Sequence, residues 1–198
     1  MNSIVGVVRY GTAGNIYSIV KAIEKANGTV KIIEESADID SVDRIVLPGV
    51  GSFFDGMKEL KERGLIDALL LTKKPVLGIC LGMQILSKVG FEYGRTSGLG
   101  LINAEVKKIV CDGPVPHVGF NHINIVDENS LLKGLESELF YFMHSFEVVN
   151  YTNILALTKY VGHEFVSAVQ KDNFYGVQFH PEKSREAGIK LFENFLSI

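Results

Sequence analysis

The sequence has little cysteine, and this limits the kinds of protein it can be. Only two cysteines, Cys80 and Cys111, occur in 198 residues, and they form no CxxC pair. Two distant cysteines make no disulfide framework, which favours a reducing compartment. A chain of this length can bury about 70% of the surface of its unfolded state, so it needs no disulfide or metal to stabilise it.

An excess of positive charge and long apolar runs are also missing. The formal net charge is −3 and no basic stripe is present, which argues against nucleic acid and anionic membrane as partners. No apolar run approaches the roughly 18 residues of a spanning helix. The first residues lack the apolar core and cleavage site of a signal peptide. We therefore expect a cytoplasmic, soluble protein.

The chain does contain β-rich runs that alternate with helical patterns. The first half predicts strands at 3–10, 29–33, 44–49 and 74–79 and helices at 14–27, 52–71 and 81–89. This alternation predicts an α/β fold with a mostly parallel sheet flanked by helices.

After residue 98 the pattern changes to successive strands. Apolar runs at 99–110, 122–126, 139–150, 154–160, 165–170 and 174–179 predict antiparallel hairpins added to one edge of the sheet, before a final helix at 183–198. No repeat or linker interrupts the chain. We therefore expect one domain over residues 1–198.

Cys80 lies in the turn between the strand at 74–79 and the helix at 81–89, with glycines at positions 78 and 82. This is the G-x-nucleophile-x-G elbow, which exposes its middle residue on a strained backbone. A helix N-terminus lowers the pKa of a thiol from about 8.5 and offers N–H donors to an oxyanion. The alternative is an inert cysteine buried in a glycine-rich turn.

His180 is the best candidate for the base that a cysteine nucleophile needs. It ends an apolar strand, and Glu182 follows two positions later, so both side chains can point the same way. The alternative is a strand-end histidine beside a solvated glutamate. His117 and His122 could be read as a metal pair, but no cysteine or acidic cluster joins them, so we expect no metal site.

A second glycine-rich turn, "LPGVGSF" at 47–53, follows the third strand. It lacks the Gly-Lys-Ser/Thr element of a phosphate-binding loop. Loops at the carboxyl ends of parallel strands gather at one crevice, so this turn should lie near Cys80. It is either an ordinary turn or a donor of N–H groups to an oxyanion.

The order of these motifs resembles the class I glutamine amidotransferases. "LPGVGSF", "GICLGMQ", "GLGLI", "VPHVGFN", "YFMHSFEV" and "GVQFHPEKS" follow one another as in that family, and most closely as in the glutaminase subunits of imidazole glycerol phosphate synthase. The resemblance spans nearly the whole chain. It implies a flavodoxin-like fold and a Cys80–His180–Glu182 triad that hydrolyses L-glutamine to glutamate and ammonia without a cofactor.

The resemblance also implies roles for other residues around the triad. N–H groups of Leu81 and Val50, in the loop that includes Gly51, would hold the oxyanion. The substrate-binding positions would be Gln84, Glu92, and the segment His144, Ser145 and Phe146.

In such enzymes ammonia passes to a (β/α)8-barrel cyclase subunit of a heterodimer. That subunit makes imidazole glycerol phosphate and aminoimidazole carboxamide ribonucleotide in histidine biosynthesis. The expected interface residues are Asn15, Phe120, Tyr141 and Lys183.

Three departures from the family pattern leave the partner open. Arg9 stands where an aspartate is usual, the first loop is one residue longer, and Phe120 replaces a tryptophan. A paralogous glutaminase that feeds another synthetase, for example in nucleotide-sugar modification, would look similar. A cysteine peptidase, a deglycase or a binding module with a dead site is disfavoured by the His-Pro-Glu and Pro-Gly-Val-Gly motifs and by the intact Cys-His-Glu set.

Overall fold

The computed structural model describes residues 3–10, 16–49 and 51–198. Its main sheet has eight strands in the order β2-β1-β3-β4-β14-β13-β12-β9. The first five strands in this order pair in parallel: β2 (Thr29–Ile33), β1 (Ile4–Val8), β3 (Arg44–Leu47), β4 (Val76–Ile79) and β14 (Phe174–Val177). The other three are antiparallel: β13 (His163–Lys171), β12 (Ile154–Tyr160) and β9 (Asn124–Ile125).

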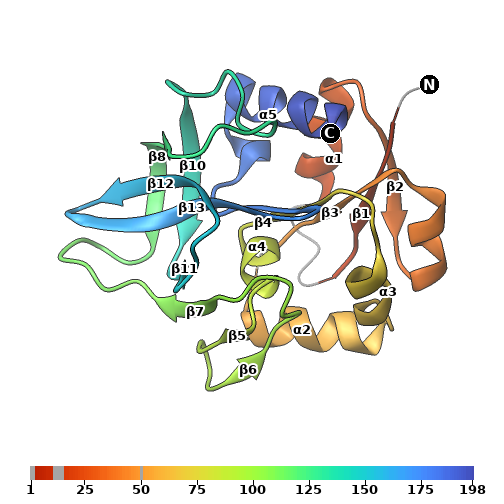
Figure 1. Cartoon of the computed structure of the whole chain (residues 1–198), viewed down its shortest axis with the longest axis horizontal. Helices are drawn as coiled ribbons and strands as arrows, with labels where there is room; N and C mark the ends of the chain where they lie inside the picture. The colour runs from red at the N-terminus through yellow and green to blue at the C-terminus, as the bar shows by residue number, and fades with distance from the viewer. Residues whose placement is uncertain (1–2, 11–15, 50) are drawn as a thin grey trace.

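Two smaller sheets stand beside the main one. One pairs β10 (Leu139–His144) with β8 (His117–His122). The other contains β11 (Phe146–Val149), β7 (Glu105–Lys108), β5 (Val89–Gly90) and β6 (Thr96–Ser97). Figure 1 shows the β8–β10 pair crossing the antiparallel end of the main sheet, with β5, β6 and β7 below it.

Helices cover both faces of the parallel strands, as the sequence predicts. In Figure 1, α1 (Ile16–Lys25) and α5 (Arg185–Ser197) lie above the sheet, whereas α2 (Phe53–Glu62), α3 (Ile66–Leu71) and α4 (Leu81–Ile85) lie below it. Each side has its own apolar core. Buried strands such as β1 are apolar throughout because both of their faces are covered. In the part of the chain that the structure describes, no helix has the length and apolar content needed to cross a bilayer.

The prediction for the last strand was wrong in one important respect. Residues 174–179 were expected among antiparallel hairpins at the edge, but β14 lies inside the main sheet, parallel to β4 and antiparallel to β13. β14 therefore joins the two halves of the sheet. An apolar run specifies a buried strand but not its neighbours, because strand order depends on contacts between distant segments.

Other boundaries also differ from the predictions. The helix expected at 81–89 ends at Ile85, and the strand expected at 139–150 is divided at Ser145 between two sheets. The strand expected at 99–110 is only Glu105–Lys108, and the strand at 117–122 was not predicted. Short strands at the border of a domain carry too few residues to show a clear alternation.

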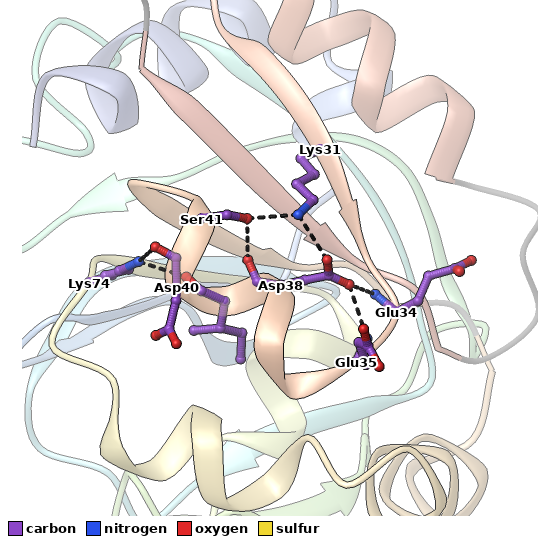
Figure 2. A network of polar contacts seen from close by, with 8 residues as sticks. Lys31, Glu34, Glu35, Asp38, Asp40, Ser41 and Lys74 are labelled. Atoms are coloured by element: carbon purple, nitrogen blue, oxygen red, sulfur yellow. Dashed lines mark hydrogen bonds and ion pairs between the residues drawn. The ribbon is translucent and has the colours of Figure 1, made fainter.

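A network of hydrogen bonds and ion pairs stabilises η2 (Ser36–Ser41), the 3-10 helix that connects β2 and β3. Figure 2 shows Asp38 accepting from the backbone N–H groups of Glu34 and Glu35 and pairing with Lys31 at 2.9 Å. Lys74, just before β4, donates to the carbonyl oxygens of Ile39, Asp40 and Val42 at 2.6, 3.0 and 2.6 Å. Lys74 thus holds η2 near the amino end of β4, away from the carboxyl ends of the strands.

Candidate active site

The nucleophile elbow that the sequence predicts is present at the end of β4. Cys80 has φ 53° and ψ −106°, a backbone conformation that residues other than glycine rarely adopt. A Cβ at position 82 would lie 1.9 Å from the carbonyl oxygen of Leu47, and one at position 78 would lie 2.5 Å from the carbonyl oxygen of Gly82. Only glycine fits at either position, so the turn brings the thiol to the carboxyl end of the sheet.

The neighbouring strand brings His180 to the same place. Val177 of β14 is in register with Ile79 of β4, and the N–H of Cys80 donates to the carbonyl of Val177 at 2.8 Å. Three residues later, Nδ1 of His180 lies 2.9 Å from Oε1 of Glu182, and both side chains are fully buried. The structure therefore brings Cys80, His180 and Glu182 together.

The charge state of His180 depends on this pairing. Burial by itself would lower the pKa of His180, but the charge of Cys80 and a hydrogen bond to it, together with Glu182, raise this pKa to about 10. Nδ1 is paired with Glu182. Nε2 is buried, and apart from Cys80 it has no hydrogen-bond partner among the described residues. The imidazolium form of His180 is thus favoured, and Nε2 is the atom able to exchange a proton with the sulfur of Cys80.

A cavity of about 200 Å³ opens at the thiol. It is smaller than the roughly 300–1,000 Å³ of sites for drug-sized ligands, as expected for a small substrate. The predicted residues that line it are Gly51, Cys80, Leu81, Gln84, Glu92, His144, Ser145, Phe146 and His180. Val50 lies outside the described residues.

Four of the five predicted substrate-binding residues already take part in side-chain hydrogen bonds within the protein. Oε2 of Glu92 accepts from the N–H of Phe53, the first residue of α2, at 2.7 Å. The carbonyl of Phe146 accepts from Nε2 of Gln84 at 3.0 Å and from Nδ1 of His144 at 2.8 Å. These bonds orient the cavity wall before any substrate arrives.

The glycine-rich loop packs directly against the elbow. A Cβ at position 49 would lie 2.4 Å from Cβ of Leu81, so only glycine allows this approach. The hydroxyl of Tyr10 donates to the carbonyl of Pro48, at the start of the loop. Burial, with a smaller contribution from the charge of Cys80, raises the pKa of Tyr10, so this hydroxyl stays protonated and can donate.

Sequence reasoning gave no role at the site to two buried polar residues, one beside Cys80 and one beside His144. Gln178 is fully buried, and its Nε2 lies 3.5 Å from Sγ of Cys80. His117 is also buried, and its Nδ1 lies 3.3 Å from Nε2 of His144. A polar residue inside the apolar run "YGVQF" was the signal that could have found Gln178. His117 and His122 stand at opposite ends of β8, so they do not form a pair.

Three of the four expected interface residues form one group at the surface, in which Phe120 and Lys183 are exposed and Tyr141 is half-buried. Phe120 and Tyr141 pack edge to face with ring centroids 5.4 Å apart, and Lys183 lies 5.6 Å from the Tyr141 ring. Arg185, which was not predicted, lies 5.0 Å from the Phe120 ring. We call these four residues the aromatic–cation cluster. Asn15 lies outside the described residues.

The cluster is linked to the catalytic groups through β10. The N–H of His180 donates to the carbonyl of Tyr141 at 2.8 Å, and the carbonyl of Met143, on the same strand, lies 4.0 Å from Sγ of Cys80. Over residues 3–10, 16–49 and 51–198, no three histidine, cysteine or acidic side chains gather as metal ligands would.

Comparison with known proteins agrees with this geometry. The family model described as Glutamine amidotransferase class-I matches residues 9–198. Imidazole glycerol phosphate synthase subunit HisH 1 of Campylobacter jejuni (strain RM1221) is 44% identical over 193 residues, which cover 94% of this chain and 96% of that protein. Subunit HisH 2 of Methanococcus maripaludis is 45% identical over 201 residues, with 97% and 98% covered.

Solved structures with much lower identity share the fold. The structure of PurLQS from Thermotoga maritima matches with a TM-score of 0.75 at 20% identity, covering 100% of this chain and 99% of that chain. A glutamine amidotransferase from the same organism matches with a TM-score of 0.65 at 19% identity, covering 92% and 77%.

Proposed function

The chain belongs to the class I glutamine amidotransferase family, and on that premise we propose that it is the glutaminase subunit of imidazole glycerol phosphate synthase. It hydrolyses L-glutamine and supplies ammonia for histidine biosynthesis. The observation that carries this proposal is that Cys80, on a strained backbone, lines one small cavity together with His180, which is paired with the buried Glu182. Identity of 44% to a HisH subunit along nearly the whole chain supports the pathway.

The proposed reaction begins with attack of the Cys80 sulfur on the side-chain amide carbon of glutamine. N–H groups of Leu81 and of the Val50–Gly51 loop hold the oxyanion that forms. His180 gives its Nε2 proton to the departing nitrogen, so the C–N bond breaks, ammonia leaves and a thioester remains. His180 then takes a proton from water, which cleaves the thioester to glutamate and restores the thiolate.

Glu182 has a supporting role in this scheme. Its carboxylate fixes the ring of His180 through Nδ1 and stabilises the imidazolium. Glu92 offers negative charge to the α-ammonium group of the substrate, and Gln84 and the His144–Phe146 segment line the same pocket. We place these roles on the residues that match the family motifs.

The ammonia acceptor is a cyclase subunit of (β/α)8-barrel form that docks on the aromatic–cation cluster. A surface pair of aromatic rings, exposed at Phe120 and half-buried at Tyr141, with Lys183 and Arg185 beside it, has the composition of an interface hot spot. Because Tyr141 and Met143 share β10, a partner on the cluster would stand close to the thiol. Ammonia would then have a short path that avoids bulk water.

The decisive experiment mixes the purified chain with a cyclase subunit of the histidine pathway, glutamine and the nucleotide substrate, and measures glutamate release. We expect the rate to rise when partner and nucleotide are present. Cys80→Ala should abolish hydrolysis and still bind the partner, while Cys111→Ala, the matched control, should keep activity. Absence of both binding and stimulation would exclude this partner.

A paralogous glutaminase that serves another synthetase is the second candidate. It is favoured by two departures near the expected partner surface. Arg9 pairs with Glu34 at 2.7 Å on the surface, and Phe120 stands under Arg185. Co-purification from cells would separate the two, because this candidate predicts a bound synthetase and glutamine hydrolysis that the histidine-type cyclase does not stimulate.

A further inference from the structure

One buried polar side chain beside the sulfur, Gln178, has no role in the proposed reaction. Gln178 follows β14 directly and has no exposed surface. Its Nε2 donates toward Sγ of Cys80 at 3.5 Å, and its Oε1 accepts from Nε2 of Gln84 at 3.0 Å. A buried amide costs free energy unless its groups are paired, so its place next to the reacting atom needs an explanation.

The direction of this amide is fixed by a main-chain carbonyl. Nε2 of Gln84 lies 3.0 Å from the carbonyl oxygen of Phe146, which can only accept a hydrogen bond. The NH2 end of Gln84 must therefore be the donor, and it faces the oxygen of Gln178. The NH2 end of Gln178 is then left to point at the sulfur. A reversed amide would set two donors or two acceptors against each other.

A donor in this position distinguishes the two states of cysteine. A thiolate is a strong acceptor, whereas a neutral thiol is a weak one, so the N–H group favours the anion. The helix after Cys80 contains only the five residues Leu81–Ile85, which makes the field at its N-terminus a smaller aid than the sequence suggested. A further hydrogen-bond donor would therefore add to the stabilisation of the thiolate form of Cys80.

We propose that Gln178 holds the Cys80 sulfur as a thiolate, with its amide oriented by Gln84 and the Phe146 carbonyl. This inference rests on the proposed function, because it assigns a role in the same reaction. It also gives Gln84 a second task. Both of its N–H groups are committed inside the protein, so only its oxygen is left to accept from a substrate. The wall of the substrate pocket thus determines the direction of the donor at the sulfur.

The test is the pH profile of alkylation by iodoacetamide in Gln178→Met, which keeps the side-chain length and removes the donor. Mass spectrometry of separate peptides follows Cys80 and Cys111 in the same molecules. A hydrogen bond to a charged group favours the thiolate about tenfold or more, so the midpoint for Cys80 should rise by about one pH unit. The profile for Cys111 should not change.

An unchanged midpoint for Cys80, or an equal shift at both cysteines, would overturn the proposal. If Gln178→Met does not fold, Gln84→Met is the variant to measure. It leaves the amide of Gln178 in place and removes the side-chain amide that orients it. The midpoint for Cys80 should then rise by a smaller amount, and a wild-type midpoint would refute the relay. Alkylation needs no glutamine, so these outcomes are independent of whether the chain proves to be a glutaminase.

Discussion

Replacing Gly82 by alanine should damage both the fold and the active site, because the added methyl group has no space. The new Cβ would lie 1.9 Å from the carbonyl oxygen of Leu47 and 2.8 Å from its carbonyl carbon, whereas ordinary contact begins at 3.4 Å. Both atoms belong to the backbone of β3, which cannot turn away as a side chain can. Either α4 or β3 must therefore shift by more than an ångström.

The size of the effect follows from this displacement. Overpacking of a well-ordered core costs about 1–3 kcal/mol, and a collision with backbone should lie at or above the upper end. Cys80 is only two residues away, so the elbow moves with the helix. A misplacement of about 1 Å can cost about a hundredfold in rate. We expect glutamine hydrolysis to fall by at least that factor in the protein that still folds.

Urea unfolding combined with glutaminase assays in the presence of partner checks this prediction. The matched control is Gly64→Ala, where φ is +65° and no atom lies within 4 Å of the added Cβ. That substitution should cost only about 1–2 kcal/mol of backbone strain and leave activity unchanged. If Gly82→Ala has the stability and rate of the wild type, the steric explanation of the elbow glycine is refuted.

Three further predictions concern separate parts of the molecule. Lys74→Met should lower the free energy of unfolding by about 1–3 kcal/mol, because three carbonyl oxygens lose their donor. The glutaminase rate should not change. A urea midpoint equal to that of the wild type would contradict the prediction. Phe120→Asp should weaken binding of the cyclase, as measured by calorimetry. The control Leu71→Asp, at an exposed position on α3, should not. Equal affinities of the two variants would show that the aromatic–cation cluster is not part of the interface. Burial lowers the pKa of His117 to about 4 and that of His144 to about 3, from 6.5, so the unfolded chain binds more protons below pH 6.5. Stability should therefore fall as pH drops from 6.5 toward 4, and less steeply in His117→Phe; a flat profile in urea unfolding would disprove it.

The local parts of the site could be predicted from the sequence because they are encoded by neighbouring residues. The glycines around Cys80 specify the elbow without reference to the rest of the chain. The spacing of His180 and Glu182 allows their contact, and the rule that loops meet at the carboxyl ends of parallel strands brings the glycine-rich turn close. The parallel part of the sheet was predictable for the same kind of reason, since alternating strands and helices require it.

The remaining features depend on contacts between distant segments. The run "FYGVQF" does not by itself predict that its strand lies between β4 and β13, because a central parallel strand and a buried hairpin strand are both apolar. The role of Gln178 depends on Gln84 and Phe146, which lie far away in the sequence. The early end of α4 likewise involves a distant segment, because the carbonyl oxygens of Ile85 and Leu86 accept from the N–H groups of Leu99 and Ile102.

The position of β14 has a consequence for synthesis of the protein. Its partners in β4 are made almost a hundred residues earlier, since Val76 pairs with Phe174. A chain emerging from the ribosome contains the segments of β1, β2, β3 and the Cys80 turn long before His180, the base, which follows the closing strand. The nascent protein therefore cannot consume glutamine, and hydrolysis begins only after the middle of the sheet has been filled.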